Sequence, residues 1–343
     1  MDFTYCHTMF KSMSRRRLYG LLTLLIVLIV IVVYTIASVI TASKNIPPEF
    51  GFTFSKKYSE FLGQDWKKAY TTILDEQNFT HVRIPIYWSD VERDRDAYWF
   101  NDITFQIEEA EKRNVKSVVV LGMRQPRWPE CYLPTWAETL NNEERAAEIQ
   151  ELITQSVKAL KRYASIEAWQ VENEPLLGFF GICPEFTAQD LKNEVTLVRS
   201  LDSRPTIVTA SGELSTWLLE ARTGDILGST LYRITGNKYF ASMNSYWFLQ
   251  PSFYRLKALA VGKDLQNYWI MELQAEPWIE GDIHDIALQD QFKTMNAKRL
   301  VEHIEFAKQV GSPRVYLWGV EWWLYVKANF GDESLWKVFQ RKI

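Results

Sequence analysis

Short apolar runs alternate with longer segments of helical periodicity from residue 51 to the end of the chain, and this alternation restricts the fold more than any other feature. The runs are rich in Val, Ile, Leu and aromatic residues, which is typical of strands buried on both faces of a parallel sheet. Eight such runs occur, at 51–55, 81–88, 115–122, 168–172, 206–211, 226–232, 268–273 and 314–319. Helical periodicity is clearest at 142–163 and 291–310, and a last short helix is expected at 333–341.

Alternating strands and helices favour a parallel sheet with helices packed on it. Eight units in the 297 residues after position 46 match an α/β fold of the (β/α)8 or TIM barrel type, whose usual size is about 250 residues with insertions. We therefore expect one TIM barrel over residues 51–343 and no second domain. In that architecture the active site is built at the C-terminal ends of the strands.

An uncharged segment, 18–43, precedes the predicted barrel, and 21–40 within it is almost entirely apolar. At 1.5 Å per residue this run is long enough to cross about 30 Å of hydrocarbon. Residues 1–17 contain Lys11 and three arginines against one aspartate, so the positive-inside rule places them in the cytoplasm. We expect a cytoplasmic tail at 1–17, a transmembrane helix at 18–43, a short linker at 44–50 and an acidic extracytoplasmic domain.

A cleaved signal peptide is the alternative interpretation of the same segment. The apolar run exceeds the roughly 7–15 residues of an ordinary signal core, and the exit at Thr41, Ala42 and Ser43 is a weak cleavage site. These two features favour an uncleaved single-pass anchor.

The composition argues against several classes of function. With four His and three Cys, no two His at ligand spacing and no Cys-x-x-Cys pair, neither a metal nor a cofactor is expected. The formal net charge is −3 and no basic block follows residue 17, so a nucleic-acid partner is not expected either. Nucleotide-binding, serine-hydrolase and zinc-protease signatures are missing from the sequence. The oligomeric state is not indicated.

Cys131 and Cys183 follow the third and fourth predicted strands, so both belong to loops at one end of the fold. A disulfide between them is plausible in an oxidising compartment. Two unpaired thiols remain the alternative, because spacing along the chain does not establish the geometry that a disulfide needs.

Carboxylates stand where two strands of the predicted barrel end. Asn173-Glu174-Pro175 follows the fourth strand, and Glu272 lies in the matching place on the seventh. Two such carboxylates are the minimum equipment for cleaving a glycosidic bond, because one protonates the leaving oxygen while the other attacks the anomeric carbon or activates water. Glu172 and Glu276 are the nearest competitors for these two roles.

This arrangement resembles the retaining glycoside hydrolases of clan A, the cellulase-like and family 5-like enzymes, which carry Asn-Glu at the end of strand four and Glu at the end of strand seven. The resemblance extends over the whole predicted barrel. It implies that Glu174 is the acid/base, that Glu272 is the nucleophile and that Asn173 bonds the sugar 2-hydroxyl. It also implies that Arg83 supports the nucleophile.

Two further residues match the resemblance in chain order. Tyr232, at the end of the sixth strand, corresponds to a tyrosine that bonds the nucleophile. Trp318, on the eighth strand, corresponds to the tryptophan that floors the sugar subsite.

The sequence departs from this pattern after the third strand, where 122–136 contains no histidine. Arg124, Gln125 and Trp128 are candidates there for contacts with sugar hydroxyls and a sugar face, although a loop that only packs fits equally well. Other tryptophans near strand ends suit stacking on pyranose rings, about half of them being expected in core or rim packing instead. They are Trp88, Trp278, Trp322 and Trp323.

The expected function is therefore a membrane-anchored retaining glycoside hydrolase that acts on a β-linked oligo- or polysaccharide. A transglycosylase with the same site is one alternative, and a glycan-binding barrel without catalysis is the other. The sequence does not define the sugar, the linkage, or endo against exo action.

Overall fold

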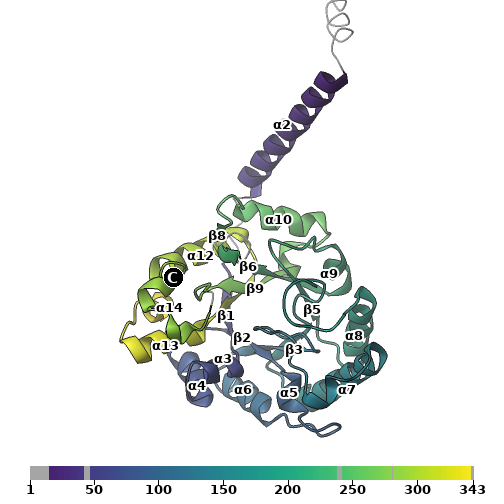
Figure 1. The fold of residues 1–343 in the computed structure, drawn as a ribbon, viewed down its shortest axis with the longest axis vertical. Coiled ribbons are helices and arrows are strands. Elements are labelled where there is room, and N and C mark those ends of the chain that lie inside the picture. Colours follow the sequence, from purple (N-terminus) through teal and green to yellow (C-terminus); the bar gives the residue numbers. More distant parts are fainter. Residues whose placement is uncertain (1–14, 42–46, 238–241, 280, 341–343) are drawn as a thin grey trace, which may run out of the picture. The chain divides into compact units, whose positions relative to one another are not determined.

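The computed structural model describes residues 15–41, 47–237, 242–279 and 281–340 (Figure 1). The chain divides into two compact units, Met1–Asn45 and Ile46–Ile343. The first unit contains helix α2 (Arg15–Thr41), in which residues 15–34 form a stretch long and apolar enough to cross a membrane. Most of the predicted tail, the end of the predicted membrane segment and the start of the predicted linker lie outside the described residues.

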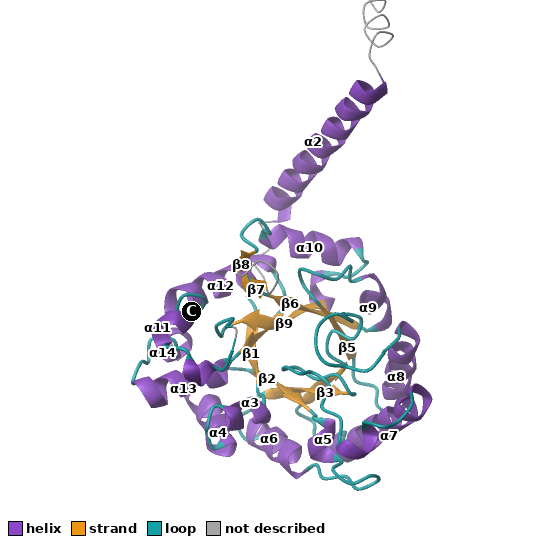
Figure 2. Ribbon diagram, viewed as in Figure 1, coloured by secondary structure: helices purple, strands orange, loops and turns teal. Residues whose placement is uncertain are grey.

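The second unit is a closed barrel of eight parallel strands, as predicted. Around the barrel each strand pairs with the next one named here, and the last pairs with the first. The strands are β1 (Glu49–Thr53), β2 (His81–Pro85), β3 (Lys116–Leu121), β4 (Ile166–Val171), β5 (Thr206–Ala210), β6 (Ile226–Leu231), β9 (Tyr268–Gln274) and β10 (Arg314–Trp318). Figure 2 shows the strands as an inner ring with helices outside it. The TIM barrel is confirmed.

Helices cover the outside of the barrel because each buries one apolar stripe against the strands. In α7, for example, Ile149, Ile153 and Val157 are buried, and Asn141 and Glu144 form a capping box at its start. The longer helices are α4 (Trp66–Glu76), α6 (Asn101–Glu111), α7 (Asn142–Leu160), α8 (Ala188–Leu201), α10 (Pro251–Ala260), α12 (Ala297–Val310) and α13 (Val320–Phe330). The shorter ones are α3 (Lys56–Phe61), α5 (Trp88–Val91), α9 (Leu218–Thr223), α11 (Leu288–Gln291), α14 (Trp336–Gln340) and the 3-10 turns η1 (Thr135–Ala137), η2 (Leu265–Asn267) and η3 (Ile283–Asp285).

The continuous helix predicted at 291–310 is wrong, because α11 ends at Gln291 and α12 begins at Ala297. Asn296 caps α12 by accepting a hydrogen bond from the backbone of Arg299 (3.1 Å). The buried side chain of Gln291 bonds the carbonyls of Ile283 (3.1 Å) and Ile286 (2.8 Å). These contacts hold the segment before the cap in a turn, although its apolar residues follow a helical period.

Other boundaries shift as well. The second strand was predicted to run to Trp88, but β2 ends at Pro85 and Trp88 begins α5. The last helix starts at Trp336 instead of 333. An antiparallel pair that the sequence analysis did not predict, β7 (Ile234–Asn237) with β8 (Ser242–Ser245), follows the sixth barrel strand.

Three of the tryptophans considered for sugar stacking belong to the core, where about half of them were expected, and stacking on a sugar is excluded for these three. Trp88, Trp322 and Trp323 are fully buried. Their indole N–H groups bond Glu92 (2.7 Å), Gln291 (2.8 Å) and the carbonyl of Ala275 (2.7 Å) respectively. A buried indole with its donor satisfied stabilises the fold and offers no face to a ligand.

Candidate active site

Arg83 joins three strands at the C-terminal end of the barrel. It lies on β2 and is fully buried. Its guanidinium donates to Gln170 Oε1 on β4 (2.8 Å), to Glu272 Oε1 on β9 (2.9 Å) and to Asn173 Oδ1 just after β4 (2.6 Å). A planar guanidinium fork with several partners fixes their relative positions. The structure thus brings together the predicted residues Arg83, Asn173 and Glu272.

The second carboxylate oxygen of Glu272 accepts a hydrogen bond from the Tyr232 hydroxyl (3.1 Å). Tyr232 follows β6, the neighbour of β9 in the barrel. Burial, and next the charge of Glu272, raise the pKa of Tyr232 well above its usual value, so the phenol stays a donor. With donors on both oxygens, the carboxylate of Glu272 is held in one orientation.

Glu174 lies in a sharp turn at the end of β4. Glu172 and Glu174 both have positive φ angles, 59° and 45°, which residues other than glycine rarely adopt and which cluster at functional sites. The backbone N–H of Glu174 donates to Thr209 Oγ1 on β5 (2.9 Å), which helps to hold the turn. The side chain is buried, with 6% of the residue exposed.

Burial raises the pKa of Glu174 well above its usual value, and the nearby charges of Glu272 and Glu130 raise it further. Among the described residues, its Oε1 atom has no hydrogen-bond partner. The site therefore pairs a carboxyl group that favours its protonated form with a second carboxylate, Glu272, beside a buried guanidinium. Such a difference between two carboxyl groups separates an acid from a nucleophile.

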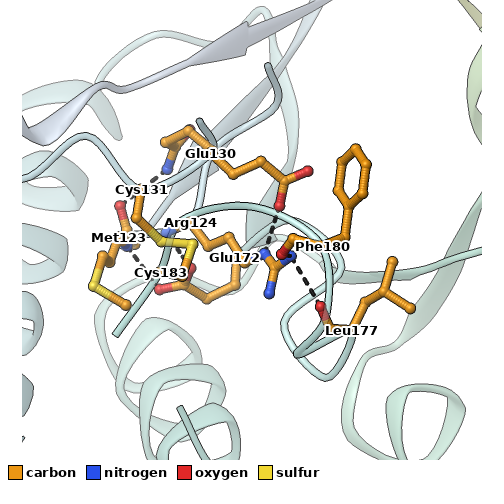
Figure 3. Close-up of a disulfide and its surroundings, with 10 residues drawn as sticks. Met123, Arg124, Glu130, Cys131, Glu172, Leu177, Phe180 and Cys183 are labelled. Atoms are coloured by element: carbon orange, nitrogen blue, oxygen red, sulfur yellow. Dashed lines mark hydrogen bonds and ion pairs between the residues drawn. A yellow bond between two sulfur atoms is a disulfide. The ribbon is translucent and has the colours of Figure 1, made fainter. Parts of the chain in front are cut away.

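The competing glutamates are engaged elsewhere. Glu172 accepts hydrogen bonds from the backbone of Met123 (2.7 Å) and Arg124, and its carboxyl group bonds that of Glu194 on α8. Figure 3 shows the side chain of Glu172 next to Met123 and Arg124. Glu276 forms an ion pair with Arg127.

The loops after β3 and β4 are joined into one unit. Arg124 bonds Glu130 (2.6 Å) and donates to the carbonyls of Leu177 (3.1 Å) and Phe180 (Figure 3). A disulfide joins Cys131 to Cys183, with the Cα atoms 5.2 Å apart, so the structure favours the bonded alternative. The disulfide points to an extracytoplasmic location for the barrel. The guanidinium of Arg124 therefore holds the loops after β3 and β4 together.

Comparison with solved structures identifies the fold. The GH5_18 protein from Streptomyces cattleya, in complex with GlcNAc, matches with a TM-score of 0.55 and 15% identity over 79% of this chain and 70% of that one. A GH5_18 variant from Bifidobacterium longum subsp. longum, in complex with Manβ1-4GlcNAc, matches with a TM-score of 0.53 and 14% identity over 79% of this chain and 68% of that one. A GH10 endo-β-1,4-xylanase from Gloeophyllum trabeum matches with a TM-score of 0.54 and 15% identity over 80% and 84%.

This chain has the fold of the clan A TIM-barrel glycoside hydrolases. At such identities the likeness concerns the fold alone. No protein-family model matches the sequence, and no curated protein matches it either. The role of each residue in this barrel therefore rests on the site geometry.

The remaining predicted residues lie at different depths. Gln125 is fully buried, and its amide bonds the backbone of Ile86 (3.2 Å) and Gly122 (3.0 Å). Trp128 is 60% exposed, and its ring contacts that of Phe180 at 5.8 Å. Contact of Gln125 or Trp128 with a sugar stays a prediction.

Trp318 ends β10 with 7% of its surface exposed. The guanidinium carbon of Arg127 lies 4.1 Å from the centre of its ring. Trp278, predicted as a further stacking residue, packs edge-on against Tyr232, with ring centres 5.9 Å apart. Contact of either tryptophan with a sugar also stays a prediction.

Sequence reasoning missed several residues that support the site. Gln170 bonds Arg83 and the carbonyl of Glu172 (2.8 Å), and a glutamine inside an otherwise apolar strand was the available signal. Glu213 accepts hydrogen bonds from the backbone of Tyr232 (3.1 Å) and the hydroxyl of Tyr254 (2.7 Å). Burial raises the pKa of Glu213 to about 7.

A metal ion has one possible set of acidic ligands among the described residues. Carboxylate oxygens of Glu92, Asp96 and Glu148 lie within 4.8 Å of one another. Glu92 already accepts from Trp88 and from the backbone of Asp96, and Glu148 pairs with Arg95. Because these contacts account for the acidic cluster, we assign no metal to it.

Proposed function

We propose that this protein is a retaining glycoside hydrolase that cleaves a β-linked glycan by double displacement. The observation that carries the proposal is the pair of environments at the barrel mouth. Glu272 accepts hydrogen bonds from Arg83 and Tyr232, whereas burial and the charge of Glu272 favour the protonated form of Glu174. The first suits a nucleophile and the second suits a general acid.

In the first step, a carboxylate oxygen of Glu272 attacks the anomeric carbon while the bond to the leaving oxygen breaks. Glu174 donates its proton to that oxygen, so the aglycone leaves as a neutral alcohol. Asn173 directly precedes Glu174 and shares the Arg83 guanidinium with Glu272, so it suits a hydrogen bond to the sugar 2-hydroxyl. The product is a glycosyl ester on Glu272.

In the second step, Glu272 has lost its charge through the ester, so the pKa of Glu174 falls and the carboxylate takes a proton from water. The resulting nucleophile attacks the anomeric carbon from the side that the aglycone left. Glu272 is released as the carboxylate, and the sugar keeps its β configuration.

The solved structures support a β-linked glycan as the substrate class. Two GH5_18 proteins with this fold are described in complex with Manβ1-4GlcNAc, and the matching GH10 protein is an endo-β-1,4-xylanase. The glycosidic bonds named in both cases have the β configuration. These matches do not define which sugar is cleaved.

The proposed enzyme is anchored in a membrane with its barrel outside the cytoplasm. Helix α2 provides an apolar stretch of sufficient length, and the basic residues before it favour a cytoplasmic N-terminus. The Cys131–Cys183 disulfide agrees with an oxidising compartment. The barrel over 51–343 would then act on glycans outside the cell membrane.

The test uses the full chain, purified in detergent, against a panel of p-nitrophenyl β-glycosides and β-linked polysaccharides. We expect hydrolysis of at least one, and a loss of 10³-fold or more in kcat/KM for Glu272→Ala on the same substrate. Glu174→Ala should lose activity most on substrates whose leaving alcohol needs protonation. Glu302→Ala, which removes an exposed carboxylate on α12, is the control and should keep full activity.

Two results would point to the alternatives. Glycosyl transfer to sugar acceptors in preference to water would indicate a transglycosylase with this site. Glycan binding that ignores both substitutions, without turnover of any substrate, would indicate a barrel that only binds.

A further inference from the structure

An arginine covers the tryptophan at the end of β10. The guanidinium carbon of Arg127 lies 4.1 Å from the ring centre of Trp318 and 3.7 Å from that of Tyr58. Arg127 also forms an ion pair with Glu276, and the side chains of both are 12% exposed. We call Tyr58, Arg127, Glu276 and Trp318 the end cap.

The end cap joins loops from distant parts of the barrel. Tyr58 lies on α3 after β1, Glu276 follows β9, and Arg127 belongs to the loop after β3. The side chain of Arg127 therefore extends from the loop after β3 to the ends of β9 and β10. Because of these contacts, Trp318 has little free ring surface, and 7% of the residue is exposed.

Several features hold the end cap in place. Burial lowers the pKa of the Arg127 guanidinium, but the negative charge of Glu276 and other neighbours outweighs it, so the group stays charged. Breaking a buried ion pair leaves an uncompensated charge, which is strongly unfavourable. Arg127 has a φ of 100°, a conformation that persists in a residue with a side chain only when surrounding contacts impose it.

The position of the end cap relative to the two carboxyl groups indicates which part of a substrate lies beside it. Around the barrel, β10 lies four strands from β4 in either direction, so the two are opposite one another. Glu174, which protonates the leaving oxygen in the proposed reaction, follows β4. In the proposed reaction this places the leaving group on the β4 side and the transferred sugar toward β10 and the end cap.

Exposed apolar side chains lie, by contrast, on the loops after β3 and β4. Trp128 is 60% exposed, Phe179 74% and Ile182 66%, all on the loops joined by the disulfide. In the proposed reaction a leaving group thus meets exposed apolar side chains, whereas the transferred sugar meets the Arg127–Glu276 ion pair.

Given the proposed function, on which this step rests, we infer that the site is exo-acting and takes one terminal, non-reducing sugar, with Arg127 determining that specificity. A second sugar on the same side would have to occupy the space that the Arg127–Glu276 pair fills. The substrate class is therefore a glycan or glycoside with a single unsubstituted β-linked sugar at its non-reducing end.

The test compares products from matched aryl glycosides with the full chain in detergent. For each of glucose, mannose and xylose, the probes are the p-nitrophenyl β-glycoside and the p-nitrophenyl β-1,4-linked disaccharide. Exo action releases a monosaccharide from the disaccharide probe first, and nitrophenol follows only after a lag. Disaccharide released together with nitrophenol in one step, by the wild-type protein, would overturn the inference.

Arg127→Ala tests the residue itself. It should gain release of disaccharide with nitrophenol, raising that product at least tenfold relative to monosaccharide. Arg95→Ala is the control, because Arg95 also pairs with a glutamate, Glu148, and lies over a tryptophan, Trp136, but its side chain is 55% exposed and its ion pair joins the loop after β2 to α7. Its product ratio should equal that of the wild type. If folded Arg127→Ala releases disaccharide and monosaccharide in the wild-type ratio, Arg127 does not determine the specificity.

Failure of the inference differs from failure of the proposed function. A wild-type protein that hydrolyses the probes but releases disaccharide keeps the proposed function and loses the exo assignment. A protein that hydrolyses none of the probes or polysaccharides overturns the proposed function, and the exo assignment with it. If Arg127→Ala does not fold, the wild-type product pattern still decides between exo and endo action.

Discussion

Arg83 is the residue on which the geometry of the candidate site depends most. Its guanidinium fixes Glu272 and Asn173 in position across the barrel mouth, and Gln170 fixes Arg83 in turn. Glu272 was predicted from its place at the end of an apolar strand, whereas Arg83 and Asn173 were predicted through the resemblance to clan A enzymes. It did not predict Arg127, because the contacts of that residue depend on how a loop crosses the mouth.

Tyr232→Phe should lower kcat/KM for an aryl β-glycoside roughly 10- to 100-fold, since a hydrogen bond to a charged group contributes about 1.5–3 kcal/mol. The substitution removes the donor to Glu272 Oε2 and keeps the ring that packs on Trp278. Steady-state kinetics, with circular dichroism to check folding, provide the measurement.

Tyr163→Phe is the matched control for that experiment. Tyr163 also donates to a glutamate, Glu108 (2.8 Å), but it does so before β4, at the opposite end of the barrel. Its kcat/KM should stay within about twofold of wild type. Equal losses in both variants would show that the effect of Tyr232 is one of general stability.

At the scale of elements, a buried pair of carboxyl groups connects β4, α8 and the loop after β3. Glu172 bonds Glu194 on α8 and the backbone of Met123 and Arg124. Burial raises the pKa of Glu172 to about 7, and burial together with the charge of Glu172 raises that of Glu194 well above its usual value. The folded protein therefore binds more protons here than the unfolded chain between pH 4.5 and at least 7.

The sign of the pH dependence follows from that difference. The stabilisation from this pair is fully present below the unfolded pKa, near 4.5, and is lost as the pH rises toward the folded pKa. Glu194→Gln removes one titrating group and offers Glu172 an amide donor. We expect little change in the free energy of unfolding at pH 5 and a gain of roughly 1–3 kcal/mol at pH 8.

Urea unfolding at the two pH values measures this difference, with Glu302→Gln on α12 as the exposed control. A change of the same size at pH 5 and pH 8 would mean that the pair does not share a proton in the folded state.

The elements were predictable where burial sets the pattern. All eight barrel strands were expected within a few residues because a strand buried on both faces must be apolar throughout. The helix expected over 291–310 fails because a capping asparagine and a buried glutamine impose a turn inside an apolar repeat. The hairpin of β7 and β8 has few apolar residues, so no strand pattern marked it.

At the scale of the whole molecule, the fold was predictable from the number of strand–helix units. The contacts between loops at the mouth of the barrel were not. All strands of a parallel barrel end at the same side, so Glu174 and Glu272 were expected at one end. The end cap and the joined loops depend on side chains from segments far apart in the sequence, such as Tyr58 and Arg127.

The chain should behave as a single-pass membrane protein. After expression, we expect it to stay in the membrane fraction through an alkaline carbonate wash and to keep its first seventeen residues. Replacing Leu25 and Leu28 of α2 with arginine should release it, because each charge near the centre of a membrane helix costs about 2.5–3.5 kcal/mol. A soluble product that begins after residue 43 would establish a cleaved signal peptide instead.

The central claim is that Glu272 attacks the sugar and Glu174 supplies and removes the proton. Azide rescue tests it most directly, with a p-nitrophenyl β-glycoside of the sugar that the wild type accepts. With Glu272→Ala, azide should replace the missing nucleophile and give the α-glycosyl azide. With Glu174→Ala, it should attack the glycosyl-enzyme and give the β-glycosyl azide. Proton NMR of the two products distinguishes them, and products of the same configuration, or none from either variant, would contradict the account.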